Sequence, residues 1–284
     1  MHENDDFSVF PQDANSFNDV LETLSKLERE LRPKDIEQRK SAQESSKTFL
    51  FRTALTIVDT SKAFFRKSEH ADDFLASTWV ALVKNKAILT TAEEPLKRFI
   101  QIDESQLREL AKLSSNEKHL KQLPRILAKE FGVILVIEPP LPSMKTDGCV
   151  MTLSTGTPVI GLSLRYNRYD YFWFTLMHEM SHITLHYNEL ATPIIDNLDE
   201  ENLTSSDKEI EANRLTADSF VPRNIWRKML LERNSKEQLL IYSQQAEIHP
   251  AIAAGLIRFN QKNYQIYSDL VNSIDVSKEF GLAR

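Results

Sequence analysis

Residues 175–182 have the sequence TLMHEMSH, an H-E-x-x-H motif in which His178 and His182 are four residues apart. In an α-helix, residues i and i+4 share one face, so the two imidazoles can converge on one metal ion. Glu179 follows the first histidine, where its carboxylate can reach a metal-activated water instead of the metal. The motif therefore predicts a divalent-metal site on a helix, with His178 and His182 as ligands and Glu179 as catalytic base.

The flanking sequence indicates that this helix is buried. Residues 169–177 read YDYFWFTLM, and Ile183 and Leu185 continue the apolar pattern. A solvated surface helix would carry a polar face. Unpaired ionisable groups are costly in an apolar setting, and a bound metal explains why two histidines and a glutamate lie there.

A third ligand is expected from outside the motif. His186 continues the histidine series, but at 1.5 Å rise per residue it lies about 12 Å along the axis from His178. One ion cannot bind both at about 2.1 Å, so His186 is interpreted as a cleft or helix-end residue that lies near the metal without binding it.

The segment 206–222, SDKEIEANRLTADSFVP, offers a better ligand in Glu209. Ser206 can cap the helix, Pro222 ends it, and Asn213 shares a face with Glu209, from which it could orient a ligand imidazole. Glu211 remains an alternative, although it projects about 200° away from Glu209 around the helix.

These segments resemble the ImmA/IrrE family of zinc metallopeptidases. The resemblance rests on residues 174–183 together with 209–222. Residues 158–170 and 248–257 resemble the branch found with HigA-type antitoxin regulators. The resemblance to the family is strong over 125–262 and weaker over 49–124. It implies that His178, His182 and Glu209 bind Zn²⁺ and that Glu179 is the catalytic base.

The chain departs from the family pattern at two places. Met180-Ser181 stands between the histidines, where the family has small residues, and Leu215-Thr216 replaces phenylalanine-alanine after the asparagine. Both changes are expected to alter packing and not chemistry. Residues 1–48 do not read as the helix-turn-helix that often begins regulators of this branch, so DNA binding by the chain itself is not expected.

The expected fold class is α+β and mostly helical. Three strands, near 133–137, 149–153 and 159–164, form a small sheet before the metal helix. A sheet, an H-E-x-x-H helix and a carboxylate helix follow one another as in zincin-like peptidases of the gluzincin type. An edge strand beside the helix could pair with an extended peptide substrate.

Four regions are predicted along the chain. Residues 1–48 form a tail, one amphipathic helix and a charged segment over 33–48 that is a linker or an exposed helix extension. Residues 49–123 are helical, and residues 124–223 form the metallopeptidase core. Residues 224–284 form a C-terminal helical subdomain with helices near 223–234, 235–246 and 250–262.

Composition agrees with a protein of the cytoplasm. The net charge of −6 argues against a large basic surface, and a single cysteine, Cys149, excludes an intramolecular disulfide. No apolar stretch approaches the length of a membrane span. Cys149 is expected to be a buried strand thiol.

The predicted function is a zinc-dependent endopeptidase that cleaves a specific intracellular regulatory protein, such as a repressor or a toxin–antitoxin component. The alternative is a non-proteolytic regulator that uses the metal fold for partner binding or sensing. Two imidazoles and a carboxylate favour zinc, although other first-row ions fit the same ligands. Candidates for stabilising the oxyanion are the donors Arg165, Tyr166, Tyr169 and His186.

Overall fold

The chain divides between Asn85 and Lys86, inside helix α4 (Ala71–Glu93), into two compact units. The structure, a computed structural model, describes residues 14–64, 71–93, 96–196 and 206–282. Residues 1–13 of the predicted tail lie outside this part. The boundaries expected at 48/49, 123/124 and 223/224 remain predictions, and the two units are described separately.

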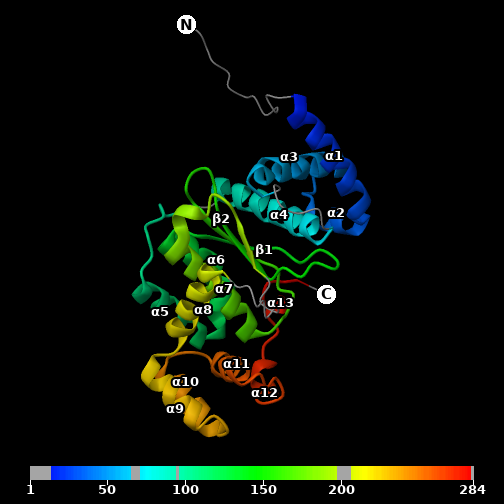
Figure 1. Cartoon of the computed structure of the whole chain (residues 1–284). Helices are drawn as coiled ribbons and strands as arrows, with labels where there is room; N and C mark the ends of the chain where they lie inside the picture. Colours follow the sequence, from blue (N-terminus) through cyan, green and yellow to red (C-terminus); the bar gives the residue numbers. More distant parts are fainter. Residues whose placement is uncertain (1–13, 65–70, 94–95, 197–205, 283–284) are drawn as a thin grey trace. The chain divides into compact units, whose positions relative to one another are not determined.

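The N-terminal unit is helical (Figure 1). It contains α1 (Ala14–Glu30), α2 (Pro33–Arg39), α3 (Ser46–Phe64) and the first part of α4. Helix α1 packs along α3 and buries Val20 and Leu27, as expected from the three- and four-residue spacing of its apolar side chains.

Part of the predicted linker is helix α2. Its Asp35 is buried, and its carboxylate accepts from Arg32 Nε at 2.7 Å and Arg39 Nη1 at 3.5 Å. The hydrogen bond from Arg32 outweighs burial and lowers the pKa of Asp35. The many charges of residues 33–48 indicated a linker or an exposed helix extension. At α2 the charges of Arg32, Asp35 and Arg39 pair with one another at helical spacing.

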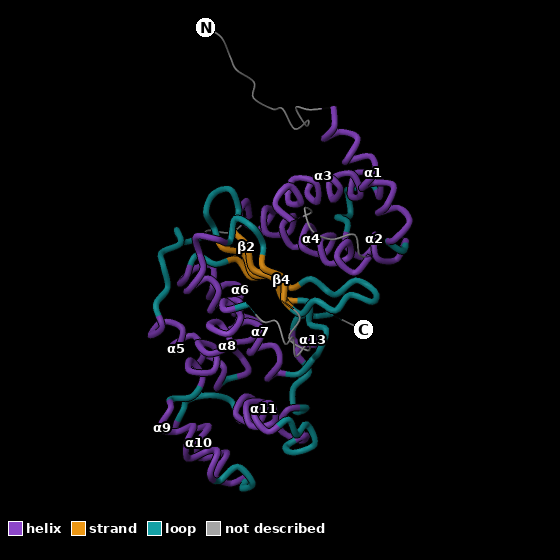
Figure 2. The backbone as a smooth tube through the Cα atoms, in the orientation of Figure 1, coloured by secondary structure: helices purple, strands orange, loops and turns teal. Residues whose placement is uncertain are grey.

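The C-terminal unit contains one four-stranded sheet, so the prediction of three strands was wrong. The strands lie together in Figure 2. Their order is β1-β3-β2-β4, with β1 parallel to β3 and the other pairs antiparallel. The strands are β1 (Ile134–Ile137), β2 (Gly148–Thr152), β3 (Pro158–Leu162) and β4 (Ile194–Asp196). Strand β4 escaped prediction because three residues are too few to show alternation.

Helices make up most of the rest of this unit, which confirms a mostly helical α+β fold. Residues 96–103 form neither helix nor strand, so the region 49–123 is not helical throughout. The remaining elements are α5 (Glu104–Lys112), η1 (Leu113–Ser115), η2 (Glu117–Gln122), α6 (Leu123–Ile126), η3 (Leu127–Phe131), α7 (Tyr169–His186), η4 (Tyr187–Glu189), α8 (Asp207–Phe220), α9 (Arg223–Leu231), α10 (Lys236–Gln245), α11 (Pro250–Gln261), α12 (Ser268–Val271) and α13 (Val276–Glu279).

Helix α7 lies at the centre of this unit. It packs against β2, β3, α5, α8 and α11. Trp173, Leu176 and Met180 are fully buried, as predicted for a helix that is apolar on nearly all sides. This packing holds the H-E-x-x-H residues in a nearly water-free environment.

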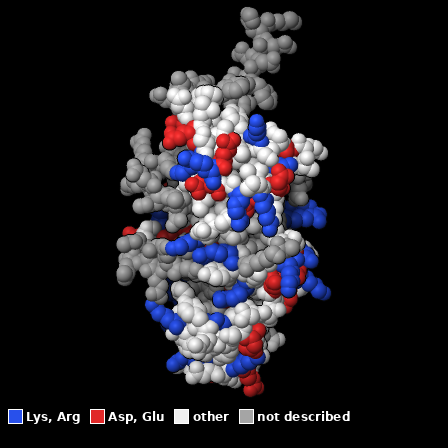
Figure 3. Space-filling model, turned by 90° about the vertical axis from the view of Figure 1, so that its right-hand side faces the viewer, with Lys and Arg blue, Asp and Glu red and all other residues white. Residues whose placement is uncertain are grey.

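Two features bear on the expectations from composition: the charges on one face and the single cysteine. Lys and Arg side chains are interspersed with Asp and Glu on the face drawn in Figure 3. Cys149 is buried in β2, and burial raises the pKa of its thiol. Among the described helices, none combines the length and apolar character needed to cross a bilayer.

Candidate metal centre

The two motif histidines face each other on α7. His178 Nε2 and His182 Nε2 are 3.1 Å apart, and both side chains are almost completely buried. The i, i+4 spacing produces this arrangement, because both residues project from the same face of the helix.

Helix α8 brings Glu209 to the same point. Its carboxylate oxygens lie 3.2 Å from His178 Nε2 and 3.4 Å from His182 Nε2. Ser206 accepts from the backbone N–H of Glu209 and caps the helix, as predicted, while the Glu209 side chain turns to the histidines. Glu211, the alternative ligand, is exposed and lies outside the cluster.

A fourth group, Asp196, was not foreseen from the sequence. Its Oδ2 lies 3.2 Å from His178 Nε2 and 3.8 Å from His182 Nε2. The ligand atoms of His178, His182, Asp196 and Glu209 all lie within 4.8 Å of one another. In the sequence, Asp196 is simply the acidic residue after Ile194 and Ile195. It reaches the histidines because this short strand pairs with β2.

The donor set fits a divalent cation. Two ligand atoms each about 2.1 Å from one tetrahedral ion lie about 3.4 Å apart, close to the separations between the imidazoles and Glu209. Asp196 Oδ2 is buried without a hydrogen-bond partner. Two imidazoles and two carboxylates that converge in this way, with Glu209 alone partly exposed, are compatible with a metal site.

The charges in the cluster are strongly coupled. Burial disfavours the imidazolium form of His178, but Asp196 and Glu209 outweigh it and raise the His178 pKa to about 9. Burial likewise disfavours the Glu209 carboxylate, but His178 and His182 hold its pKa well below the usual range. The electrostatics of the cluster therefore favour positive charge beside the Glu209 carboxylate.

Glu179 lies beside the cluster and not in it. It is fully buried, and neither carboxylate oxygen has a hydrogen-bond partner. Burial, followed by the charge of Asp196, raises its pKa well above the ordinary value. A carboxyl group with a raised pKa is suited to accept and return a proton.

Gly148, the first residue of β2, makes room for the Glu179 carboxylate. A Cβ at this position would lie 2.1 Å from Glu179 Oε1 and 2.9 Å from Thr175 Cγ2. Sequence reasoning missed this role, although a glycine within a strand often marks such a close approach.

A Gly148→Ala variant should therefore displace the Glu179 carboxylate without removing a metal ligand. Peptide cleavage is expected to fall by about 10- to 100-fold, because such displacement misplaces the reacting groups. Kinetic assays with metal analysis test this. A Gly281→Ala control adds a Cβ with no atom within 4 Å, at a residue with φ +69° far from Glu179 in the sequence; the positive φ costs some stability, but the variant should cleave normally. Unchanged cleavage by Gly148→Ala would contradict the assignment.

Two other predicted residues lie apart from the four clustered groups. Asn213 is exposed on α8, and the Nδ1 atoms of His178 and His182 have no hydrogen-bond partner. The structure therefore does not bring Asn213 to a ligand imidazole. His186 is buried at the end of α7, with its Nε2 3.4 Å from the carbonyl oxygen of Lys208.

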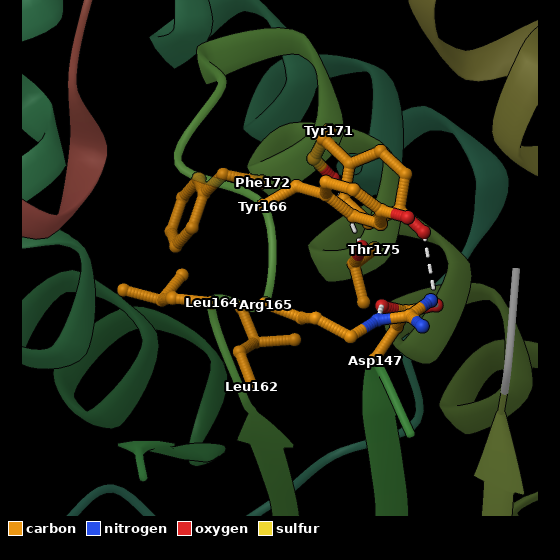
Figure 4. A pocket seen from close by; sticks show the side chains of 8 residues that line it. All are labelled: Asp147, Leu162, Leu164, Arg165, Tyr166, Tyr171, Phe172 and Thr175. Carbon is orange, nitrogen blue, oxygen red and sulfur yellow. Dashed lines mark hydrogen bonds and ion pairs between the residues drawn. The ribbon is translucent and has the colours of Figure 1, made fainter. Parts of the chain in front are cut away.

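The candidate oxyanion donors have other contacts. Arg165 donates from Nε and Nη2 to both oxygens of Asp147, at 2.9 and 3.0 Å, and Tyr171 donates to the same carboxylate (Figure 4). Tyr166 packs edge-on against Tyr171. The buried Tyr169 donates to a backbone carbonyl 55 residues earlier in the chain. None of them belongs to the cluster formed by the described residues.

The two departures from the family pattern meet in the structure. Ser181 Oγ on α7 and Thr216 Oγ1 on α8 are 3.0 Å apart, and both are buried. Each hydroxyl also lies within hydrogen-bond distance of a carbonyl of its own helix. Since each hydroxyl has one proton, one can donate across the interface while the other bonds its own helix. The pair therefore links the helix of the histidines to the helix of Glu209.

A double-mutant cycle with Ser181→Ala and Thr216→Ala should show this link. The coupling energy is expected to be about 0.5–1.5 kcal/mol in urea unfolding, because only the pair makes the inter-helix hydrogen bond. Thr184→Ala with Thr216→Ala is the control, since Thr184 bonds the Met180 carbonyl on α7, and its effects should add. Additive effects of Ser181→Ala and Thr216→Ala would rule out the link.

Comparison with known proteins points to one family. Residues 128–249 match the model of Peptidase_M78, the IrrE N-terminal-like domain. The match spans all four strands, α7 and α8, and thus the whole cluster. A search of curated proteins found no match.

Proposed function

Because this chain belongs to the ImmA/IrrE family through its IrrE N-terminal-like domain, we propose that it is a zinc-dependent endopeptidase that cleaves a specific regulatory protein. The family membership itself supports a metallopeptidase-type function. The substrate, the metal and the roles of individual residues are the proposal.

The observation that carries the proposal is the convergence of His178, His182 and Glu209 beside the buried Glu179. The two imidazoles of α7 and the Glu209 carboxylate of α8 have ligand atoms 3.1–3.4 Å apart. The glutamate that follows the first histidine is placed next to them by the helix itself.

In the proposed mechanism His178, His182 and Glu209 would hold the ion. When bound, the ion supplies a Lewis acid that acidifies water and polarises the scissile carbonyl. Glu179 takes a proton from the attacking water and delivers it to the departing amine. Its burial and the nearby Asp196 raise its pKa, which makes the protonated form accessible between these two transfers.

An extended peptide substrate would bind along β4. Within the described sheet β4 is an edge strand, and its last residue, Asp196, contacts the cluster. Backbone pairing to an edge strand fixes a peptide with little dependence on its side chains. Such pairing would bring a scissile carbonyl close to His178.

The proposed substrate is a cytoplasmic repressor or a toxin–antitoxin component, in line with the resemblance to the HigA-type branch. A non-proteolytic regulator is the second candidate. It is favoured by Asp196, because four protein ligands are typical of closed, structural zinc sites.

Cleavage of candidate proteins separates the two functions. Purified protein loaded with zinc would be incubated with repressors encoded near its gene, and the products would be identified by mass spectrometry. The endopeptidase proposal expects a defined cut that is absent with a chelator and with Glu179→Gln. If the protein binds these partners and leaves them intact, the non-proteolytic function holds.

A further inference from the structure

We propose that Asp196 is a fourth ligand that closes the metal site in the resting protein, and that it must leave the ion before a substrate is cleaved. This inference rests on the proposed metal centre. It concerns how the centre is regulated.

The position of Asp196 is that of a ligand. Its Oδ2 approaches His178 Nε2 as closely as Glu209 does, at 3.2 Å. The side chain is 7% exposed, and Oδ2 is buried without a hydrogen-bond partner. A buried carboxylate oxygen without a hydrogen bond is costly unless a cation lies beside it.

The local charge balance also calls for a cation. Asp196 and Glu209 lie 3.2 Å from His178 Nε2, and Glu179 is a third buried carboxyl group beside them, with no hydrogen-bond partner for either oxygen. Like charges so close together destabilise one another. A divalent cation bound by two neutral imidazoles would be neutralised by the carboxylates of Asp196 and Glu209.

Four protein ligands would leave no position for catalysis. Structural zinc sites have four protein ligands, whereas catalytic sites have three and keep one position for water or substrate. With Asp196 bound, the centre has the four protein ligands of a structural site. Without Asp196, His178, His182 and Glu209 form a three-ligand centre of the catalytic type.

Strand β4 is suited to release Asp196. It has three residues, and it pairs only with β2 among the described strands, with Asp196 opposite Gly148. Ile194 and Ile195 are only half-buried. A peptide that pairs with this edge would bind the strand that carries Asp196, so substrate binding and release of the ligand can be linked.

Cobalt-substituted protein tests the inference without an activity assay. The visible d–d absorption of the Co²⁺ protein would be recorded while azide is added as an anionic probe. We expect the wild-type spectrum to resist azide, because all four positions are filled. Asp196→Ala should bind azide and shift its spectrum.

A matched control is Glu211→Ala, which removes an exposed carboxylate of α8 outside the cluster and should behave as wild type. Equal azide responses in wild type and Asp196→Ala would overturn the closed site while leaving the metal centre intact. Failure of the wild type to bind Co²⁺ or Zn²⁺ would instead overturn the metal centre and, with it, this inference.

Two further measurements address the case in which Asp196→Ala loses the metal and the effect of the Asp196 variants on cleavage. If Asp196→Ala does not retain cobalt, Asp196→Asn, which keeps a weak oxygen ligand, should show the azide response. Cleavage of a peptide substrate by the metal-loaded Asp196 variants should be faster than by wild type. Loss of cleavage with full metal occupancy would show that Asp196 is not a ligand that blocks the site.

Discussion

A Glu179→Gln variant is expected to cleave its substrate about 10²- to 10⁴-fold more slowly than wild type, because a glutamine cannot take the proton from water. Glutamine has nearly the shape of glutamate, so it fits beside Gly148 and keeps the packing of α7. Glu179 lies outside the four clustered groups. Metal content should therefore stay at the wild-type value.

The measurement is the turnover rate on a defined cleavage site, together with zinc analysis of the same samples. Glu211→Gln is the matched control, because it makes the same chemical change at an exposed position on α8 and should cleave normally. Wild-type rates from the Glu179→Gln protein would exclude Glu179 as the base. Loss of zinc from this variant would mean that Glu179 is a ligand instead.

Zinc is expected to raise the melting temperature of the protein by about 8–16 °C at a free concentration one thousand times its dissociation constant. Binding to the folded state alone stabilises by about 4.1 kcal/mol at that concentration. For a domain of 150–250 residues, which includes the unit at 86–284, each kcal/mol shifts the melting temperature by about 2–4 °C. The four clustered groups come from α7, β4 and α8, so unfolding separates them.

Differential scanning calorimetry with and without zinc tests this expectation. His182→Ala removes a buried imidazole of the cluster and should abolish most of the rise, whereas His119→Ala, at a histidine of η2 outside the cluster, should preserve it. An equal rise in wild type and His182→Ala would place the zinc elsewhere on the chain.

Local sequence signals were sufficient for several parts of the fold and the site. The apolar run before His178 predicted a buried helix, and α7 is buried along most of its length. Ser206 and Pro222 predicted the start and end of α8, which runs from Asp207 to Phe220. Capping, proline termination and helical periodicity act within a few residues, which is why they can be recognised in sequence.

Other features depend on segments that are distant in the chain. Gly148 lies near Glu179 because β2 packs under α7. Ser181 and Thr216 form a pair because α8 packs on α7. From the sequence, the departures from the family pattern at Ser181 and Thr216 indicated only a change in side-chain packing. Their hydrogen bond could not be foreseen, because the two residues are 35 positions apart.

By itself, the sequence determined the helix of the candidate metal centre, its two histidines and the glutamate beside them, because the three residues lie within five consecutive positions, little more than one helical turn. It also pointed to Glu209 through the second helix. Only the tertiary structure decided that Asp196 joins them, because a three-residue strand has no periodicity of its own and is held by pairing with β2. The number of protein groups at the centre, and hence whether it is open or closed, follows from that pairing.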